Sequence, residues 1–306
     1  MEWEVSLMEW LQNNLGDFCS VFGKIFSFIG GEMGLLIMFL ILLFCWKKEA
    51  GKRVGLVVIM VSAWLPMLKC VVKRLRPFME YPDRVKPLAL EDKSASPMDI
   101  SAQGYSFPSQ HSASVAALYF QLAHEAKKRW LWILAIVFTV LVGFSRVATG
   151  MHYPTDVLAG WALGFVIIGI HALLLKFIPN ETARHLVVLA VSLLGLIYVR
   201  TEDYFTALGM LIGFVVAVEI EKRFVQFKDT RNIWAMILRI VGAFVIYFVL
   251  NKLLKLPFSS EFLGSGSFAA LLVRSARYAI IVFVILGLFP KMFPLFEKIG
   301  GKKRKK

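Results

Sequence analysis

The chain has 306 residues, of which 58% are hydrophobic and 18% are charged. A soluble protein of this length is about half apolar and about a quarter charged, so the composition excludes an ordinary soluble domain and indicates a membrane protein. The formal net charge of +14 does not indicate nucleic-acid binding, because the basic residues lie mostly in short segments between apolar runs, where they orient spans relative to the cytoplasm.

The amino-terminal segment, residues 1–21, has Trp3, Leu7 and Trp10 interleaved with acidic residues. This pattern is typical of a short amphipathic helix that lies in the membrane interface. The segment contains no Lys or Arg, so we expect no cleavable signal peptide.

The apolar runs that follow predict about nine membrane-spanning helices, because a bilayer core needs about 20 apolar residues and favours helices. The predicted helices cover residues 22–46, 54–73, 109–125, 130–149, 155–177, 183–199, 204–220, 233–250 and 268–288. The expected fold is therefore an all-α, polytopic membrane helix bundle. We divide it into a core of about six spans (residues 22–200), about three additional spans (residues 201–290) and a basic cytoplasmic tail (residues 291–306).

The charges between the predicted spans alternate. Basic clusters occur at residues 47–53, 127–129, 176–184, 222–231 and 291–306. All of these fall on one side of the membrane if the spans number nine, which makes that side cytoplasmic and places the amino terminus outside. We expect a bacterial plasma membrane protein whose tail lies against anionic lipid.

One basic cluster lies on the opposite, extracytoplasmic side. It consists of Lys69, Lys73, Arg74, Arg76, Arg84 and Lys86. Lys73 or Arg74 is interpreted as an interfacial anchor. The rest of the cluster indicates function, because it breaks the charge pattern that sets topology.

Three polar segments share this outer side: residues 69–77, 105–112 and 145–156. Lys69, Arg76 and Arg146 offer an ammonium and two planar guanidinium groups, which suit the oxygens of a phosphoryl group. Ser109 begins a predicted helix, where free N–H groups favour an anion.

Two histidines belong to the same segments, and they are candidates for a nucleophile and a proton donor. His111 lies in the second segment and His152 in the third. Asp156 follows His152 by four residues and, if Pro154 begins the next helix, is expected to orient the imidazole.

Simpler interpretations exist for single residues. Arg146 alone would suit an interfacial anchor, and His152 with Asp156 would suit a pair of metal ligands. Three nearby cations would repel a divalent metal ion and attract an oxyanion. We therefore expect neither a metal nor a cofactor. The cysteines at positions 19, 45 and 70 show no paired spacing and predict neither a disulfide nor a metal site.

The three segments read Lys-x6-Arg-Pro, Pro-Ser-x-His and Ser-Arg-x5-His-x3-Asp. Together they resemble the signature motifs of the type 2 phosphatidic acid phosphatase superfamily, which also holds vanadium haloperoxidases and glucose-6-phosphatase. The match runs from Lys69 to Asp156 and implies a haloperoxidase-like helical core. It further implies that His152 attacks phosphorus to form a phosphohistidine, that Asp156 orients it, and that His111 protonates the leaving group and then activates water.

The resemblance also assigns the phosphate-binding residues, which would be Lys69, Arg76, Ser109 and Arg146. The chain departs from the family at Gln110, where glycine is usual. The backbone N–H that helps to hold the phosphate is retained, whereas the added side chain would narrow the pocket or change the preferred leaving group.

The expected substrate is a lipid phosphate, because the site lies at headgroup depth. Candidates are undecaprenyl pyrophosphate, phosphatidic acid, phosphatidylglycerol phosphate and a sphingoid-base phosphate. The segment of residues 78–107 is long for a connection and would be able to form a lid over the headgroup. The alternatives are a sugar-phosphate phosphatase of the glucose-6-phosphatase type and a non-catalytic lipid-binding or transport relative. Arg274 and Arg277, in the last predicted span, would face a polar path or serve as anchors.

Overall fold

The computed structural model describes residues 2–90 and 95–299, and this part of the chain is helical without any β-strand. The predicted basic run at residues 302–306 lies outside the described residues. The chain forms two compact units, one made of Met1–Leu36 and Met60–Leu174 and the other of Ile37–Ile59 and Leu175–Lys306. The all-α prediction is confirmed for the described residues.

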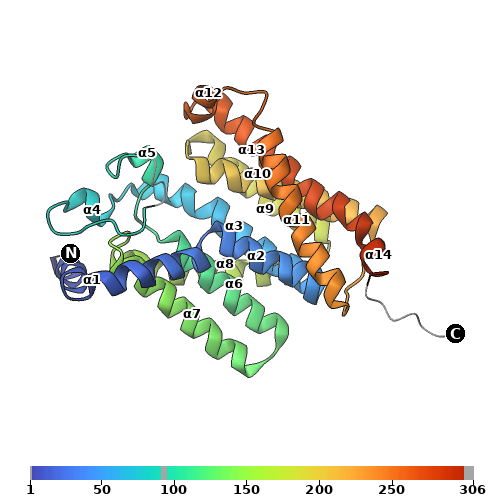
Figure 1. Ribbon diagram of the computed structural model, residues 1–306, viewed down its shortest axis with the longest axis horizontal. Helices are drawn as coiled ribbons and strands as arrows, with labels where there is room; N and C mark the ends of the chain where they lie inside the picture. The colour runs from blue at the N-terminus through green and yellow to red at the C-terminus, as the bar shows by residue number, and fades with distance from the viewer. Residues whose placement is uncertain (1, 91–94, 300–306) are drawn as a thin grey trace. The chain divides into compact units, whose positions relative to one another are not determined.

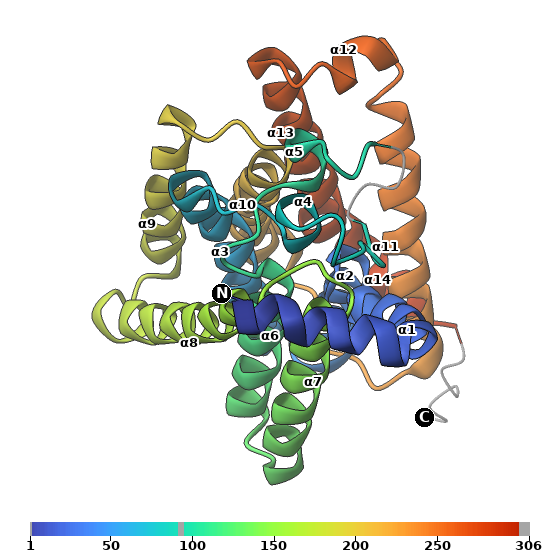
Figure 2. The ribbon, with the colours of Figure 1, turned by 90° about the vertical axis from the view of Figure 1, so that its left-hand side faces the viewer.

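The first unit contains every segment with a predicted catalytic residue. Its helices are α1 (Glu2–Gly30), the start of α2 (Glu32–Ile41), most of α3 (Lys48–Val72), α4 (Pro77–Glu80), α5 (Ile100–Gln103), α6 (Gln110–Ala126), α7 (Arg129–Ala148) and most of α8 (Pro154–Phe177). The helices α6 and α7 form a hairpin, and α1 runs beside α7 and meets α6 (Figures 1 and 2).

A glycine marks the break between α1 and α2, which meet at an angle of 46°. A Cβ atom at Gly31 would lie 2.7 Å from the carbonyl oxygen of Ser27, which is too close for any side chain. The sequence predicted a single helix over residues 22–46. The structure instead begins a helix at Glu2 and bends the chain at Gly31, because only glycine permits so close a backbone approach.

The amino-terminal half of α1 packs into the first unit. Val5 and Met8 are fully buried and share a hydrophobic cluster with Tyr153, which follows α7. Trp3 and Trp10 lie on the exposed face of the helix. The interfacial location of residues 1–21 stays a prediction, but the buried face shows that this segment belongs to the packed helical unit.

The second unit consists mainly of helices that follow the motifs. It contains η1 (Leu42–Trp46), α9 (Glu181–Leu193), η2 (Leu194–Ile197), α10 (Glu202–Ile220), η3 (Glu221–Val225), α11 (Ile233–Leu253), α12 (Ser260–Gly264), α13 (Phe268–Phe283), η4 (Val284–Leu288), η5 (Phe289–Met292) and α14 (Phe293–Phe296). The close pair α10 and α13 depends on Gly209, where a Cβ atom would lie 2.1 Å from the carbonyl oxygen of Ser275. Small residues allow such helix contacts in membranes.

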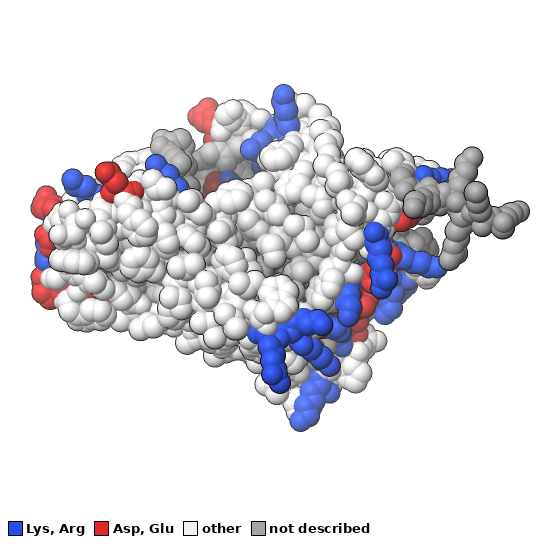
Figure 3. All heavy atoms as spheres, turned by 60° about the horizontal axis from the view of Figure 1, so that its bottom comes forward, with Lys and Arg blue, Asp and Glu red and all other residues white. Residues whose placement is uncertain are grey.

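Six segments among the described residues are long and apolar enough to cross a membrane. They are Lys48–Glu80, Arg129–Ala148, Pro154–Phe177, Glu202–Val225, Ile233–Leu253 and Phe268–Phe296, and the bent pair of α1 and α2 makes a seventh if it is one span. The chain is therefore an integral membrane protein. Figure 3 shows a broad region without charged side chains, with Lys, Arg, Asp and Glu gathered beyond its borders, as expected of a surface that meets lipid.

The predicted number of nine spans is not shown. All nine apolar runs are helical, but α6 has 17 residues and α9 has 13. Both are shorter than the roughly 20 residues that a bilayer core requires. The sequence-based count treated each apolar run as a crossing, whereas helix length makes these two runs weaker candidates.

Candidate active site

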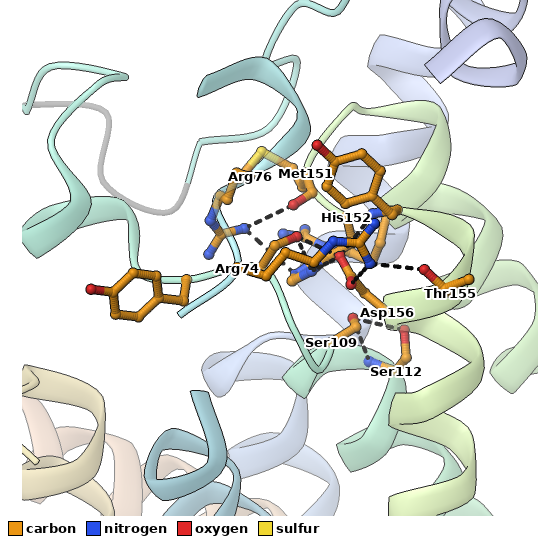
Figure 4. Close-up of polar contacts among 12 residues, drawn as sticks. Arg74, Arg76, Ser109, Ser112, Met151, His152, Thr155 and Asp156 are labelled. Atoms are coloured by element: carbon orange, nitrogen blue, oxygen red, sulfur yellow. Dashed lines mark hydrogen bonds and ion pairs between the residues drawn. The ribbon is translucent and has the colours of Figure 1, made fainter. Parts of the chain in front are cut away.

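Three turns of the first unit meet around His152: the segment after α3, the start of α6 and the turn between α7 and α8 (Figure 4). The backbone N–H of Ser109 donates to the carbonyl oxygen of Asp156 at 3.0 Å, which ties the start of α6 to α8. Arg76, after α3, donates through Nη1 to the carbonyl oxygen of Met151 at 3.2 Å. The structure thus brings together the segments that carry the three motifs.

Arg76 is held rigidly against the imidazole. The residue is 2% exposed, and its guanidinium donates to the carbonyl oxygens of Gly104, Gln103 and Met151. Its Nη1 also lies 3.5 Å from Nε2 of His152. Since Arg76 remains charged at any accessible pH, a phosphoryl group placed at Nε2 would meet a fixed positive charge.

Asp156 lies on the other side of the imidazole and is completely buried. Its Oδ2 accepts hydrogen bonds from the Ser106 hydroxyl at 2.5 Å and from the backbone N–H of Tyr153 at 2.9 Å. The distance from Oδ2 to Nδ1 of His152 is 3.7 Å, longer than a hydrogen bond, whereas the Ser106 hydroxyl lies 3.4 Å from Nδ1. Ser106 is therefore close to both members of the His–Asp pair.

Arg74 forms an ion pair with the other carboxylate oxygen of Asp156. Its Nη1 lies 2.7 Å from Oδ1 of Asp156, and its guanidinium stacks 3.8 Å above the ring of Tyr153. The side chain is only 17% exposed. Of the two residues offered as an interfacial anchor, Arg74 does not fit that role, because its side chain turns inward to a buried carboxylate. Lys73 is exposed, and its role as an anchor stays a prediction.

Glu4 reaches the same network from α1. It is 1% exposed, and its Oε2 lies 3.2 Å from Nη2 of Arg74. Its Oε1 accepts from both the backbone N–H and the hydroxyl of Thr155, at 3.0 and 2.7 Å. Sequence reasoning missed both Glu4 and Ser106 as members of the site.

The remaining predicted cations are also tied into the first unit. Lys69 is 8% exposed, and its Nζ donates to the carbonyl oxygen of Tyr105 at 3.0 Å. Arg146, in the last turn of α7, is 1% exposed and donates to the hydroxyl of Ser27 on α1 at 2.7 Å. Both are therefore held by groups close to the motif segments.

The start of α6 carries the remaining candidates. Ser109 is the N-cap, and its hydroxyl accepts from the backbone N–H of Ser112. Gln110 is the first helical residue, and its side-chain oxygen is buried without a hydrogen-bond partner among the described residues. His111 follows, with its Nε2 3.6 Å from the position that a Cβ atom on Gly31 would occupy. The glycine break between α1 and α2 thus lies directly against His111.

Tyr153 is a buried neighbour of His152 whose hydroxyl donates to Oε2 of Glu80 at 2.7 Å. Burial and this carboxylate raise the pKa of Tyr153 above its ordinary value. The phenol therefore stays protonated and serves as a fixed donor instead of an acid.

Two further predictions concern other parts of the chain. Among the described residues no group of three or more His, Cys, Asp and Glu side chains is arranged to hold a metal ion.

In the second unit, Arg274 pairs with Glu202. Arg277, which is 6% exposed, donates to Oδ1 of Asn251 at 2.7 Å. Arg277 is buried, so it is not a residue that extends to the membrane surface as an anchor.

Residues 51–179 match the family model described as the PAP2 superfamily. Residues 205–302 match a second model, described as PAP2 superfamily phosphatase, transmembrane extension. The chain belongs to the PAP2 superfamily. The first match contains every motif residue from Lys69 to Asp156, so the resemblance seen in the sequence is confirmed.

Curated PAP2 relatives match over part of their length. The chain is 35% identical over 154 residues to the undecaprenyl-diphosphatase of Sulfolobus acidocaldarius, covering 50% of this chain and 65% of that protein. It is 33% identical over 122 residues to phosphatidylglycerophosphatase B of Bacillus subtilis, covering 37% and 54% respectively. A lipid A 4'-phosphatase of Bacteroides thetaiotaomicron is 35% identical over 82 residues, covering 26% and 35%. The chain thus matches less than two thirds of each relative, and no solved structure matches it significantly.

Proposed function

We propose that this PAP2 protein hydrolyses a lipid phosphate or pyrophosphate by way of a phosphohistidine at His152. The observation that carries the proposal is the position of the imidazole. Its Nε2 faces the Arg76 guanidinium at 3.5 Å, and its Nδ1 faces Ser106 and Asp156. One nitrogen is therefore directed to an anion site, and the other to a carboxylate network that stabilises positive charge on the ring.

In the first step the lone pair of His152 Nε2 attacks phosphorus, and the bond from phosphorus to the leaving oxygen breaks. His111 donates its proton to the leaving oxygen, which departs as an alcohol or a phosphate. Asp156 stabilises the positive charge that develops on His152. In the second step His111 takes a proton from water, the hydroxide attacks phosphorus, and His152 leaves with inorganic phosphate as the product.

The phosphate oxygens would be held by Lys69, Arg76, Arg146 and the start of α6. Arg76 and Arg146 are 2% and 1% exposed, so both act where water screens charge weakly. The Ser109 hydroxyl and the backbone N–H of Gln110 add neutral donors at a helix N-terminus, where an anion is favoured. The proposal requires neither a metal nor a cofactor.

A lipid is the proposed substrate class because the site belongs to a unit of membrane helices. The relatives' names add support, since they include an undecaprenyl-diphosphatase and a phosphatidylglycerophosphatase. We place the site on the extracytoplasmic face. If α6 and α9 both cross the membrane, most of the basic loops lie on the opposite side, which is then the cytoplasmic side. A sugar-phosphate phosphatase of the glucose-6-phosphatase type is the alternative, and it rests on the same assumption that α6 and α9 both cross the membrane.

A phosphate-release panel tests this function. The purified protein in detergent micelles would be given phosphatidic acid, undecaprenyl pyrophosphate, sphingosine 1-phosphate and glucose 6-phosphate in turn. We expect turnover of at least one lipid in excess EDTA, and inhibition by vanadate, which imitates a five-coordinate phosphoryl group. Turnover of glucose 6-phosphate alone would contradict the lipid assignment. Loss of all activity on chelation would favour a metal site.

A further inference from the structure

A continuous line of charges runs from α1 to the imidazole. Oε2 of Glu4 lies 3.2 Å from Nη2 of Arg74, and Nη1 of the same guanidinium lies 2.7 Å from Oδ1 of Asp156. Asp156 in turn borders His152. Arg74 is thus shared between two buried carboxylates, one on α1 and one on α8.

Burial makes the presence of Glu4 informative. A carboxylate that is 1% exposed loses its hydration, which is costly unless its oxygens are paired. Glu4 has such partners: Arg74 on one oxygen and the N–H and hydroxyl of Thr155 on the other. All of them adjoin Asp156.

Glu4 also supports the start of α8. That helix begins at Pro154, so Thr155 and Asp156 lie in its first turn. The first N–H groups of a helix have no partner within the helix, and negative charge is favoured beside them. Glu4 supplies this partner from another helix, and it thereby fixes the turn that carries Asp156.

The charges give Glu4 a second effect. The charges of Asp156 and Arg74 alone sum to zero, so Arg74 offsets part of the stabilisation that Asp156 gives to a positive charge at His152. With Glu4 included, the three groups sum to −1. The network then favours a positively charged imidazole, as phosphohistidine formation requires.

We propose that Glu4 is a positioning residue of the active site, which holds Arg74 and Thr155 and leaves the Asp156 charge available to His152. This inference rests on the proposed function of His152. It assigns a contribution to α1, although α1 precedes the region that matches the PAP2 family model. A simpler alternative is that Glu4 only fastens α1 to α8.

Other charged groups around the imidazole stay constant in the test. Arg76 faces Nε2, and Glu80 reaches Tyr153, the residue next to His152. Both groups are present and unchanged in every variant used. Differences between the variants therefore report on the charges of Glu4 and Arg74.

The experiment compares Glu4→Gln, Arg74→Gln and the double variant in the full-length protein. Gln at position 4 keeps an oxygen that accepts from Thr155 but removes the charge. The readouts are kcat, KM and the pH dependence of kcat/KM with the best lipid substrate of the panel. The acid limb is the part of this pH profile in which kcat/KM falls as the pH is lowered. Glu9→Gln is the matched control, because Glu9 lies on the same helix and pairs with Arg84, outside the network.

We expect Glu4→Gln to lower kcat about tenfold or more, as is typical for a residue that orients a catalytic group through a second residue, with little change in KM. Loss of negative charge disfavours protonated His152, so the acid limb should move to lower pH, on the order of one unit for a nearby charge. Arg74→Gln should move it to higher pH. The double variant restores the sum of −1 and should return the limb close to that of the wild type.

A role confined to fastening helices predicts a different result. Glu4→Gln would then lower stability and protein yield without moving the acid limb. The acid limb of the double variant would also not return to its wild-type pH. Either outcome overturns the proposal. If Glu4→Gln fails to fold, the double variant is compared with Arg74→Gln instead. The proposal expects the acid limb of the double variant at lower pH, and equal limbs in the two variants contradict it. An inactive wild-type protein would instead refute the proposed function.

Discussion

The hydroxyl of Ser106 donates a 2.5 Å hydrogen bond to Oδ2 of Asp156, and the Ser106 hydroxyl oxygen lies 3.4 Å from Nδ1 of His152. The carboxylate and the imidazole are 3.7 Å apart, so their coupling depends on how Asp156 is held. Ser106 holds one oxygen of the carboxylate while Arg74 holds the other.

Ser106→Ala should therefore lower kcat about tenfold or more, because a hydrogen bond to a charged group contributes about 1.5–3 kcal/mol and about 1.4 kcal/mol corresponds to a factor of ten. The measurement is phosphate release at saturating substrate. Ser101→Ala is the matched control, since Ser101 donates to Asp99 at 2.6 Å on the exposed part of the same segment. Unchanged turnover in Ser106→Ala would show that Asp156 supports His152 without the serine.

Ser27→Ala tests whether α1 aligns a phosphate-binding arginine. Ser27 accepts a 2.7 Å hydrogen bond from Nη1 of Arg146, which the proposed function assigns to the phosphate oxygens. We expect KM and the inhibition constant for vanadate to rise about three- to tenfold, because the guanidinium is less well oriented. Ser20→Ala on the same helix should leave both constants unchanged. An inhibition constant for vanadate equal to that of the wild type would show that the contact with Ser27 does not position Arg146 for phosphate.

Gln110→Pro removes one backbone N–H while keeping the start of α6. Gln110 is the first residue of the helix, and Ser109 before it has φ −71° and ψ 110°, which is compatible with a following proline. If this N–H binds phosphate, vanadate inhibition should weaken about tenfold in Gln110→Pro but not in Gln110→Ala. Equal inhibition constants in the two variants would remove the N–H from the phosphate site.

Cysteine labelling tests the orientation of the chain. Ser96 and Lys128 are both exposed, and the loop charges predict that they lie on opposite sides of the membrane. In a background without Cys19, Cys45 and Cys70, an impermeant maleimide applied to intact cells should label Ser96→Cys but not Lys128→Cys. The opposite pattern would place the site on the cytoplasmic face.

The sequence predicted the helices and most of the candidate site because both have strong local signals. Apolar runs indicate helices, and the spacing of Lys69 with Arg76 and of His152 with Asp156 is distinctive. The bend at Gly31 was missed because residues 22–46 read as one apolar run. The helix lengths that reduce the support for nine spans depend on where α6 and α9 end, which hydrophobicity alone does not define.

Glu4, Arg74 and Ser106 were missed for a different reason. Glu4 and Thr155 are 151 positions apart in the chain, so no spacing pattern connects them. The one signal in the sequence was that Glu4 lies next to Val5 and in the same stretch as Met8. The structure shows that both of these apolar residues are buried. A helix whose acidic residue shares its buried face indicates an internal cation, but the sequence alone does not identify Arg74.

The central claim is that His152 carries the phosphoryl group during turnover, and rapid-quench labelling tests it most directly. The purified protein would be mixed with lipid substrate labelled with ³²P in its terminal phosphate and quenched with alkali within the first turnover. We predict labelled protein whose phosphate is stable in alkali and labile in acid, maps to His152, and is absent from His152→Ala. Full turnover by His152→Ala, or label on another residue, would contradict the account.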